Sequence, residues 1–283
     1  MALPSAWPAD VDVLSIDLEA RELPASDARQ VMCQAAQHLR SAARLLLKID
    51  STLRGPIAAM IEGALDGSGC SSAVVAPAFP EQGRDIVDGR LHVHGSPRQT
   101  VPDVGSPLHD SAELDALATA WPDHPEWLLA GSAGIARRLA GPATERVTRP
   151  PSGSVLVVAG SPAEATRRQL ERLPPTVRVL STSPTELRDT GGAARALADT
   201  IDLSQRPGLL MLTGGATARA VCAKLGASGI RLHGEVQPGM PVGTLLGGAW
   251  DGVVVLTKAG GFGPPDALLD ALRALGPSCL DTP

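Results

Sequence analysis

The sequence predicts an α/β protein made of two α/β domains with largely parallel sheets. Short runs of β-branched residues alternate with stretches rich in Ala and Leu, which is typical of strands and helices that follow one another in parallel sheets. The segment 141–154 is polar, contains three prolines and separates two such blocks, so it is the best candidate for a linker. A length of 283 residues leaves room for two domains.

In the first block, strands and helices are expected to alternate from the start. The expected strands cover residues 11–16, 43–49, 72–76 and 127–130, and the expected helices cover 26–41, 56–65 and 134–139. Ser26 is a good N-cap for the first helix, and Val31, Ala35 and Leu39 share one of its faces. The stretch 89–104 has hairpin or loop character, and periodicity does not decide between the two.

The second block repeats the same alternation. Strands are expected at 155–159, 177–180, 209–212 and 253–257, and helices at 163–173, 192–201, 217–225 and 265–275. No repeat of fixed period runs through either block.

Composition argues against several classes of protein. The net charge of −5 and the 2% of aromatic residues do not favour nucleic-acid binding, which uses basic surfaces and stacking rings. The four cysteines form no CxxC motif, so neither a zinc site nor a redox pair is expected, and no metal ligands are predicted among the side chains. The N-terminus is not a secretory signal and the apolar runs are strand-sized, so we expect a cytoplasmic protein that does not span a membrane.

Three glycine-containing turns of the second block are the first candidate site. They are Ala-Gly-Ser-Pro at 159–162, Thr-Gly-Gly-Ala-Thr at 213–217 and Lys-Ala-Gly-Gly-Phe-Gly at 258–263, and each follows a predicted strand and precedes a helix. Glycine lets the backbone approach an anion, and a helix N-terminus offers unpaired N–H groups. The turns therefore predict phosphate binding, with Lys258 as a mobile positive charge. One such turn alone is usually only a tight connection, and neither GxxxxGK[ST] nor a complete GxGxxG fingerprint is present.

The second candidate site is the polar segment Lys-Ile-Asp-Ser-Thr-Leu-Arg-Gly at 48–55, where a predicted strand ends. Alternation along the strand points Lys48 and Asp50 to the same side. Lys and Arg suit a carboxylate or phosphate, whereas Asp, Ser and Thr suit sugar hydroxyls. The alternative is a capping turn with a surface ion pair. Downstream, the loop 76–84 presents Arg84, and the histidines show no ligand spacing.

Taken together, in their order along the chain, these motifs resemble those of the four-carbon acid sugar kinase family, and the resemblance spans nearly the whole chain. The segments that carry the resemblance are 48–55, 75–84 with 88–90, 131–134, 160–169, 212–218, 234–243 and 257–263. The resemblance implies a two-domain kinase with a cleft between its domains. It implies a substrate-binding N-terminal domain, residues 1–145, for a short hydroxy acid such as a threonate, erythronate or 3-oxo-tetronate. It implies a nucleotide-binding C-terminal domain, residues 153–283, for ATP with Mg²⁺.

The resemblance also assigns roles to residues. The residues that match the ATP-contacting turns are Ser161, Gly214, Gly215, Ala216, Thr217, Lys258, Gly260 and Gly261. Those expected on the substrate side are Arg21, Lys48, Asp50, Ser51, Arg54 and Arg84. Asp50 and Lys258 are the expected catalytic residues. Phosphoryl transfer depends mostly on positioning and charge stabilisation, so cationic groups and Mg²⁺ are expected to matter most.

The chain departs from the family pattern at two positions. The family opens with a strand that ends in an Asp-Asp-x-Thr-Gly-Ala turn, whereas residues 11–17 match the family's second strand, so the N-terminal domain is expected to be truncated at its start. Ala216 replaces an acid that is usual in the second phosphate turn. Because the family's best candidate for a general base is then missing, Asp50 is the remaining candidate.

These departures leave three functional hypotheses open. The first is an ATP-dependent kinase of carbohydrate metabolism that phosphorylates a hydroxyl of a four-carbon sugar acid. The second is a catalytically impaired, nucleotide-binding regulator. The third is a divergent kinase for another hydroxy acid in a specialised biosynthetic pathway. A homodimer that covers an exposed sheet edge is a further expectation.

Overall fold

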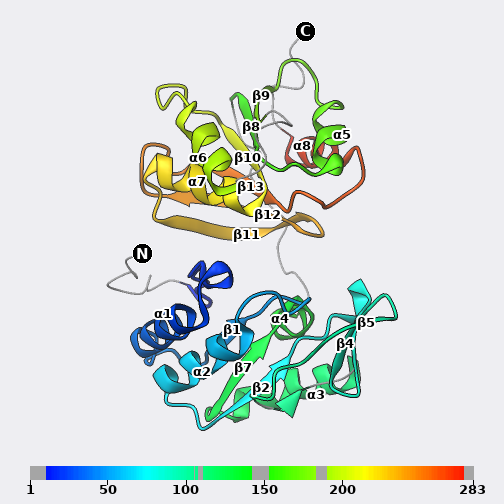
Figure 1. Cartoon of the computed structure of the whole chain (residues 1–283). Helices are drawn as coiled ribbons and strands as arrows, with labels where there is room; N and C mark the ends of the chain where they lie inside the picture. Colours follow the sequence, from blue (N-terminus) through cyan, green and yellow to red (C-terminus); the bar gives the residue numbers. More distant parts are fainter. Residues whose placement is uncertain (1–10, 105, 108–110, 142–152, 183–189, 277–283) are drawn as a thin grey trace. The chain divides into compact units, whose positions relative to one another are not determined.

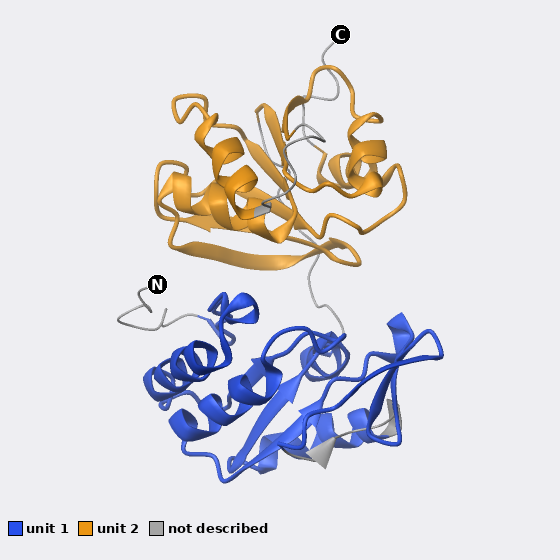
Figure 2. Cartoon of the chain, in the orientation of Figure 1, with its two compact units in different colours: residues 1–141 blue, residues 142–283 orange. Residues whose placement is uncertain are grey.

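The computed structural model describes residues 11–104, 106–107, 111–141, 153–182 and 190–276, and it divides the chain into two compact units (Figures 1 and 2). Unit 1 spans Met1–Gly141 and unit 2 spans Pro142–Pro283. Each unit has hydrophobic clusters of its own. Both units are α/β, which confirms the predicted fold class, while the predicted cleft between the domains stays a prediction.

Unit 1 is built on a parallel sheet of four strands in the order β1-β7-β2-β6. The strands are β1 (Leu46–Lys48), β2 (Ser72–Ala76), β6 (Ser106–Pro107) and β7 (Trp127–Gly131). The helices are α1 (Ala25–His38), α2 (Ile57–Ser68), α3 (Ser111–Ala120) and α4 (Ala133–Ala140), with 3-10 turns at Ala20–Glu22, Pro80–Gln82 and Trp121–Asp123. The inner strands β7 and β2 supply fully buried core residues such as Leu129 and Val75, as expected of parallel strands covered on both faces.

Helices α1 and α2 pack closely through two glycines of α2. A Cβ atom on Gly63 would stand 2.2 Å from the carbonyl oxygen of Arg29, and one on Gly67 would stand 2.2 Å from that of Cys33. At the rim of this contact, Arg29 forms ion pairs with Glu62 and Asp66 at 3.0 and 2.8 Å. The close helix pairing therefore depends on the absence of side chains at both glycines.

The segment 89–104, for which the sequence did not decide between a hairpin and a loop, belongs to a separate antiparallel sheet of three strands. Its strands are β3 (Arg84–Val87), β4 (Arg90–Val93) and β5 (Ser96–Thr100). Two-residue turns join them, and both residues of each turn have positive φ: 49° and 69° at Asp88-Gly89, and 48° and 76° at His94-Gly95. This backbone is the one that tight hairpins require.

The prediction of a strand at 11–16 is wrong. The described residues of this segment pair with no strand, and Val13 is 84% exposed. A strand is defined by hydrogen bonds to a neighbouring strand, so a run of β-branched and apolar residues is not sufficient by itself to form one. The first described element is instead the 3-10 turn Ala20–Glu22.

Unit 2 is a six-stranded mixed sheet in the order β11-β12-β13-β10-β8-β9. Strands β8 (Val155–Ala159), β9 (Arg178–Ser181), β10 (Leu209–Thr213) and β13 (Val254–Lys258) run parallel to one another, and an antiparallel hairpin of β11 (Gly229–Gln237) and β12 (Met240–Leu246) extends one edge. The helices are α5 (Glu164–Leu170), α6 (Thr190–Asp199), α7 (Gly215–Leu225) and α8 (Ala267–Leu275).

Alternation along β10 divides the interior of unit 2 into two cores. Leu209 and Met211 belong to the cluster that includes Leu268 of α8. Leu210 and Leu212 belong to the cluster that includes Val221 of α7. Every residue of β10 is buried, which explains why this strand is a continuous apolar run in the sequence.

Most predicted elements lie within a few residues of their observed bounds, but some were missed. The sequence pattern did not predict α3, β3 or the hairpin β11–β12, although 234–243 is one of the motifs that carry the family resemblance. The predicted linker lies largely at 142–152, outside the described residues. Among the residues that the structure describes, no helix is both long and apolar enough to cross a bilayer.

Candidate functional site

The three glycine-containing turns of unit 2 follow three neighbouring strands. Strand β10 lies between β8 and β13, and the last residues of these strands are in register: Thr213 pairs with Ala159 on one side and with Lys258 on the other. Parallel strands end at the same edge of a sheet, so the three turns emerge side by side. The predicted phosphate-binding turns are therefore brought together by the fold.

Direct contacts join the turns to one another. The N–H of Gly214 donates a hydrogen bond to the carbonyl oxygen of Lys258 at 2.8 Å. A Cβ atom on Gly160 would stand 2.4 Å from the Thr217 Oγ1 atom. Gly214 has a φ of 98°, a conformation that favours glycine. The close approach of the three turns thus requires glycine at several positions.

The turns leave backbone donors available. Within the described chain, no acceptor pairs with the N–H groups of Gly215, Ala216 or Thr217 in the first turn of α7, nor with those of Gly260 and Gly261. Gly215 and Gly261 are exposed. Unpaired amides at a helix N-terminus, beside a second set on a glycine-rich loop, suit an oxyanion such as a phosphate. The buried Thr213 Oγ1 atom also has no hydrogen-bond partner among the described residues.

Lys258 is not the mobile charge that the sequence predicted. Its side chain is only 3% exposed, and its ammonium donates to the carbonyl oxygens of Ala259, Gly260 and Phe262 at 2.8, 3.2 and 2.9 Å. The last residue of a buried strand points its side chain into the interior, where these carbonyls satisfy it. Burial lowers the pKa of Lys258 to about 8. Lys258 therefore contacts the loop in this structure, and its expected contact with a phosphate stays a prediction.

Two residues of α5 hold the same loop and were not predicted as site residues. The Thr166 hydroxyl donates to the Gly260 carbonyl at 2.8 Å. The Gln169 amide donates to the carbonyls of Phe262, Gly263 and Pro264 at 2.9, 3.1 and 2.9 Å. Both side chains are at most 1% exposed. Their spacing of three on a helix directly after a glycine turn was the signal that could have identified them.

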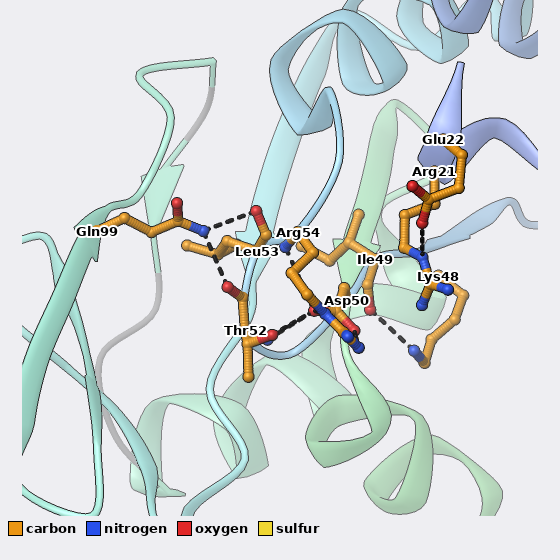
Figure 3. Close-up of polar contacts among 9 residues, drawn as sticks. All are labelled: Arg21, Glu22, Lys48, Ile49, Asp50, Thr52, Leu53, Arg54 and Gln99. Atoms are coloured by element: carbon orange, nitrogen blue, oxygen red, sulfur yellow. Dashed lines mark hydrogen bonds and ion pairs between the residues drawn. The ribbon is translucent and has the colours of Figure 1, made fainter. Parts of the chain in front are cut away.

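In unit 1, Asp50 organises the segment that follows β1 (Figure 3). Its carboxylate accepts hydrogen bonds from the Nε and Nη2 atoms of Arg54 at 2.9 and 3.0 Å, and from the N–H and hydroxyl of Thr52. Burial alone would raise the pKa of Asp50, but the hydrogen bonds from Arg54 and Thr52 outweigh it and hold the pKa well below its usual range. A carboxylate with such low proton affinity is a poor general base at neutral pH.

Lys48 and Arg21 lie beside this segment (Figure 3). The Lys48 ammonium folds back on the chain and donates to the Ile49 carbonyl at 2.8 Å. Desolvation lowers the pKa of Lys48, the charge of Asp50 opposes this lowering, and the charge of Arg21 adds to it. The Arg21 side chain itself pairs with Glu22 at 3.0 Å.

An open groove of about 680 Å³ lies between the 52–55 segment and the three-stranded sheet. Arg54 and Arg98 both line it, and Arg98 is exposed without an ion pair among the described residues. The Gln99 amide fixes the groove by donating to the carbonyls of Thr52 and Leu53 at 2.9 and 2.7 Å (Figure 3). Arg98 and Gln99 were missed because the sequence did not settle the strand that carries them. The full lining is Thr52, Leu53, Arg54, Gly55, Val93, Arg98 and Gln99.

Of the predicted substrate residues only Arg54 lines this groove, and Arg84 and Ser51 are placed as follows. Arg84 donates from Nη1 to the Gln82 carbonyl at 3.0 Å, so its guanidinium is turned toward its own loop. Its buried Nε atom has no partner in the described part of the chain. Ser51 lies in the turn between Asp50 and Thr52 and is half-exposed. No group of three or more His, Cys, Asp or Glu side chains that could hold a metal ion occurs in the described part of the chain.

The two halves of the chain match two family models. Residues 2–112 match a "Sugar-binding N-terminal domain", and residues 190–268 match a "Nucleotide-binding C-terminal domain". A D-threonate kinase of Bordetella bronchiseptica is 32% identical over 93% of this chain and 86% of its own length. A D-threonate kinase of Salmonella typhimurium is 30% identical over 92% of this chain and 88% of its own.

Solved structures agree on the fold. A protein of Salmonella typhimurium LT2 superposes with a TM-score of 0.78 at 18% identity, over 96% of this chain and 91% of that one. A Haemophilus influenzae protein of the DUF1537 family superposes with a TM-score of 0.72 at 18% identity, over 96% and 92%. The fold and the relatives together define a two-unit α/β protein of the sugar-kinase type. The chain belongs to the four-carbon acid sugar kinase family.

Proposed function

We propose that this chain is an ATP-dependent kinase that phosphorylates a hydroxyl group of a four-carbon sugar acid. The observation that carries the proposal is the meeting of three glycine turns at the ends of β8, β10 and β13. The names of the relatives support the substrate class: besides the D-threonate kinases, a D-erythronate kinase of Heliobacterium modesticaldum is 34% identical over 38% of this chain and 26% of its own length.

On the nucleotide side, the proposal assigns the phosphates to backbone donors. The N–H groups of Gly215 and Ala216 at the start of α7 would hold one phosphate, and those of Gly260 and Gly261 another. Bound Mg²⁺ would supply neutralisation of the phosphate charge. The described side chains offer no cluster of three acids for it, so we propose that the ion arrives on the nucleotide.

On the acid side, the proposal assigns the substrate carboxylate to arginine. Arg54 and Arg98 line one groove, and guanidinium groups bind carboxylates through two parallel hydrogen bonds. Asp50 keeps Arg54 in place through its own paired hydrogen bonds. Because phosphoryl transfer passes through a loose transition state, charge stabilisation and alignment contribute more than early proton removal.

An ADP-release assay tests the proposal. The purified chain is supplied with MgATP and with D-threonate, D-erythronate or 3-oxo-tetronate, and erythritol serves as a control that lacks the carboxylate. We expect one of the acids to stimulate ADP release and erythritol to leave it at the background rate. Nucleotide binding without acid-stimulated release would contradict the kinase.

That same negative result would favour a second candidate, a nucleotide-binding protein without turnover. The specific observation behind it is Ala216, which places a methyl group where the family pattern has an acid. An Ala216→Asp variant separates the two ideas. A gain of acid-stimulated turnover in this variant would assign the loss of catalysis to that position.

A further inference from the structure

We infer that Lys258 is a positioning residue for nucleotide binding: it touches the loop 259–263 rather than the nucleotide, and it turns that loop so that its free amides face the phosphates. This inference rests on the proposed nucleotide site. It replaces the direct contact that the sequence predicted with an action through peptide groups.

The first step is the convergence of carbonyl groups on one atom. The Nζ atom of Lys258 donates to the carbonyl oxygens of Ala259, Gly260 and Phe262. Three donors are the full capacity of an ammonium group. The side chain is 3% exposed, so these bonds are shielded from water. Lys258 therefore fixes the direction of three peptide groups in a loop of five residues.

The second step follows from peptide geometry. In a planar trans peptide the N–H points opposite to the C=O. Carbonyls that point toward Lys258 therefore turn the N–H groups of Gly260, Gly261 and Gly263 away from it. None of these three N–H groups has an acceptor among the residues that the structure describes. The orientation that makes them available to an anion is thus the one that Lys258 imposes.

Residues of α5 hold the same carbonyl groups from a second direction. The Gly260 carbonyl accepts from both Lys258 and Thr166, and the Phe262 carbonyl accepts from both Lys258 and Gln169. Gln169 also holds the carbonyls of Gly263 and Pro264. Lys258, Thr166 and Gln169 therefore hold the carbonyl groups of the loop on its buried side, while Gly261 is exposed to solvent.

The positive charge of Lys258 can attract a bound anion, which the neutral side chains of Thr166 and Gln169 cannot do. No carboxylate forms an ion pair with Lys258 in the part of the chain that the structure describes. A buried cation without a counter-ion is costly, and an anion bound on the other side of the loop would offset that cost. The ammonium thus favours a phosphate that it does not contact.

Matched variants test the inference. Lys258→Met keeps the length of the side chain but removes the charge and the donors, and Lys258→Arg keeps the charge in a planar group that cannot reach three converging carbonyls in the same way. Lys224→Met is the control, because Lys224 is a surface lysine on α7 paired with Asp199 at 3.3 Å. Binding of MgADP is measured by calorimetry, KM for ATP and for the acid by steady-state kinetics, and folding by circular dichroism.

We expect Lys258→Met to weaken MgADP binding and raise KM for ATP by about tenfold or more, while KM for the acid changes by less than about twofold. Lys258→Arg should recover only part of the loss, and Lys224→Met should match the unmodified chain. A folded Lys258→Met protein with unchanged MgADP affinity would overturn the inference. If the unmodified chain binds no nucleotide, it is the proposed function that fails.

A milder variant covers the case in which Lys258→Met does not fold. Thr166→Val removes one hydrogen bond to the Gly260 carbonyl and leaves the charge in place. We expect it to raise KM for ATP by about threefold without changing KM for the acid. Equal ATP parameters for Thr166→Val and the unmodified chain would count against the inference.

Discussion

Gly260 and Ser161 lie so close that a Cβ atom on Gly260 would stand 1.8 Å from the Ser161 Oγ atom and 2.5 Å from its Cβ atom. The two residues come from turns that are almost a hundred positions apart in the sequence, yet they meet where β8 and β13 end on either side of β10. No rotamer of a residue as short as serine relieves a clash with its own Cβ, so a side chain at position 260 would push the turns apart.

Gly260→Ala is therefore expected to abolish nucleotide binding, because the added methyl group separates the two turns. Gly261→Ala is the matched control, since a Cβ atom there meets nothing within 4 Å. Calorimetric titration with MgADP should show at least about a hundredfold loss for the first variant and less than about threefold for the second. Equal affinities would mean that the turns do not share a ligand.

The low pKa of Lys258 predicts opposite effects of pH on stability and on binding. Burial lowers the pKa to about 8 from an ordinary value of 10.5. Between these values the unfolded chain holds more protons than the folded chain, so this group makes the free energy of unfolding rise with pH. Nucleotide binding should weaken over the same range, because the neutral amine no longer supplies charge.

Calorimetry can measure the proton that accompanies this binding. A phosphate near Lys258 raises its pKa, so MgADP binding near pH 8 should take up protons, and the observed heat should differ between buffers of different ionisation enthalpy. Lys258→Met should remove that difference. Proton uptake that persists in this variant would assign it to another group.

Arg98→Ala should weaken the acid substrate. Arg98 lines the groove together with Arg54, so its loss should raise KM for the acid about tenfold with a smaller change in kcat. The effect should shrink as salt is added, because Arg98 is exposed. Arg90→Ala on the neighbouring strand is the control and should leave KM unchanged, since Arg90 does not line the groove.

Asp50→Asn distinguishes a positioning carboxylate from a general base. The pKa of Asp50 lies well below its usual range, so its stabilising effect is complete above the pH at which an unfolded aspartate ionises and is lost only as the pH falls into the acid range. The variant should raise KM for the acid, because Arg54 loses its partner. The acid limb of the pH–rate profile should keep its midpoint; a midpoint that disappears would identify Asp50 as the base.

Gly63→Ala should lower the melting temperature. Alanine is favoured over glycine in a helix by about 1 kcal/mol, so an uncrowded site would be stabilised. Here a Cβ atom would stand 2.2 Å from the Arg29 carbonyl oxygen, and overpacking of this kind costs about 1–3 kcal/mol. Thermal unfolding followed by circular dichroism checks the sign, and a rise in melting temperature would show that α1 and α2 separate freely.

The sequence predicted an element best where the strand preference of the segment agreed with its burial in the fold. The strand predicted at 155–159 matches β8 residue for residue, because a short continuous apolar run between glycine and polar residues is typical of a buried strand in a parallel sheet. The three glycine turns were predictable from their position after such strands. Their mutual contact required the strand order, which places β10 between β8 and β13.

The misses have physical causes. Residues 11–16 are rich in β-branched and apolar residues, as strands are, but pairing depends on a neighbour that the local pattern does not reveal. Lys258 was expected to be mobile, but the direction of its side chain at the end of β13 turns it inward to the loop carbonyls. Arg98 depends on a hairpin whose turns, Asp88-Gly89 and His94-Gly95, were visible in the sequence but were not read as such.

Each hydrophobic cluster of the described residues belongs to one unit: one cluster lies within residues 18–139, and two lie within residues 155–275. A substitution in the interior of one unit is therefore accommodated by repacking within that unit's own cluster. Under the proposed roles of the two units, recombination between relatives could join a new acid-binding unit to an unchanged nucleotide-binding unit.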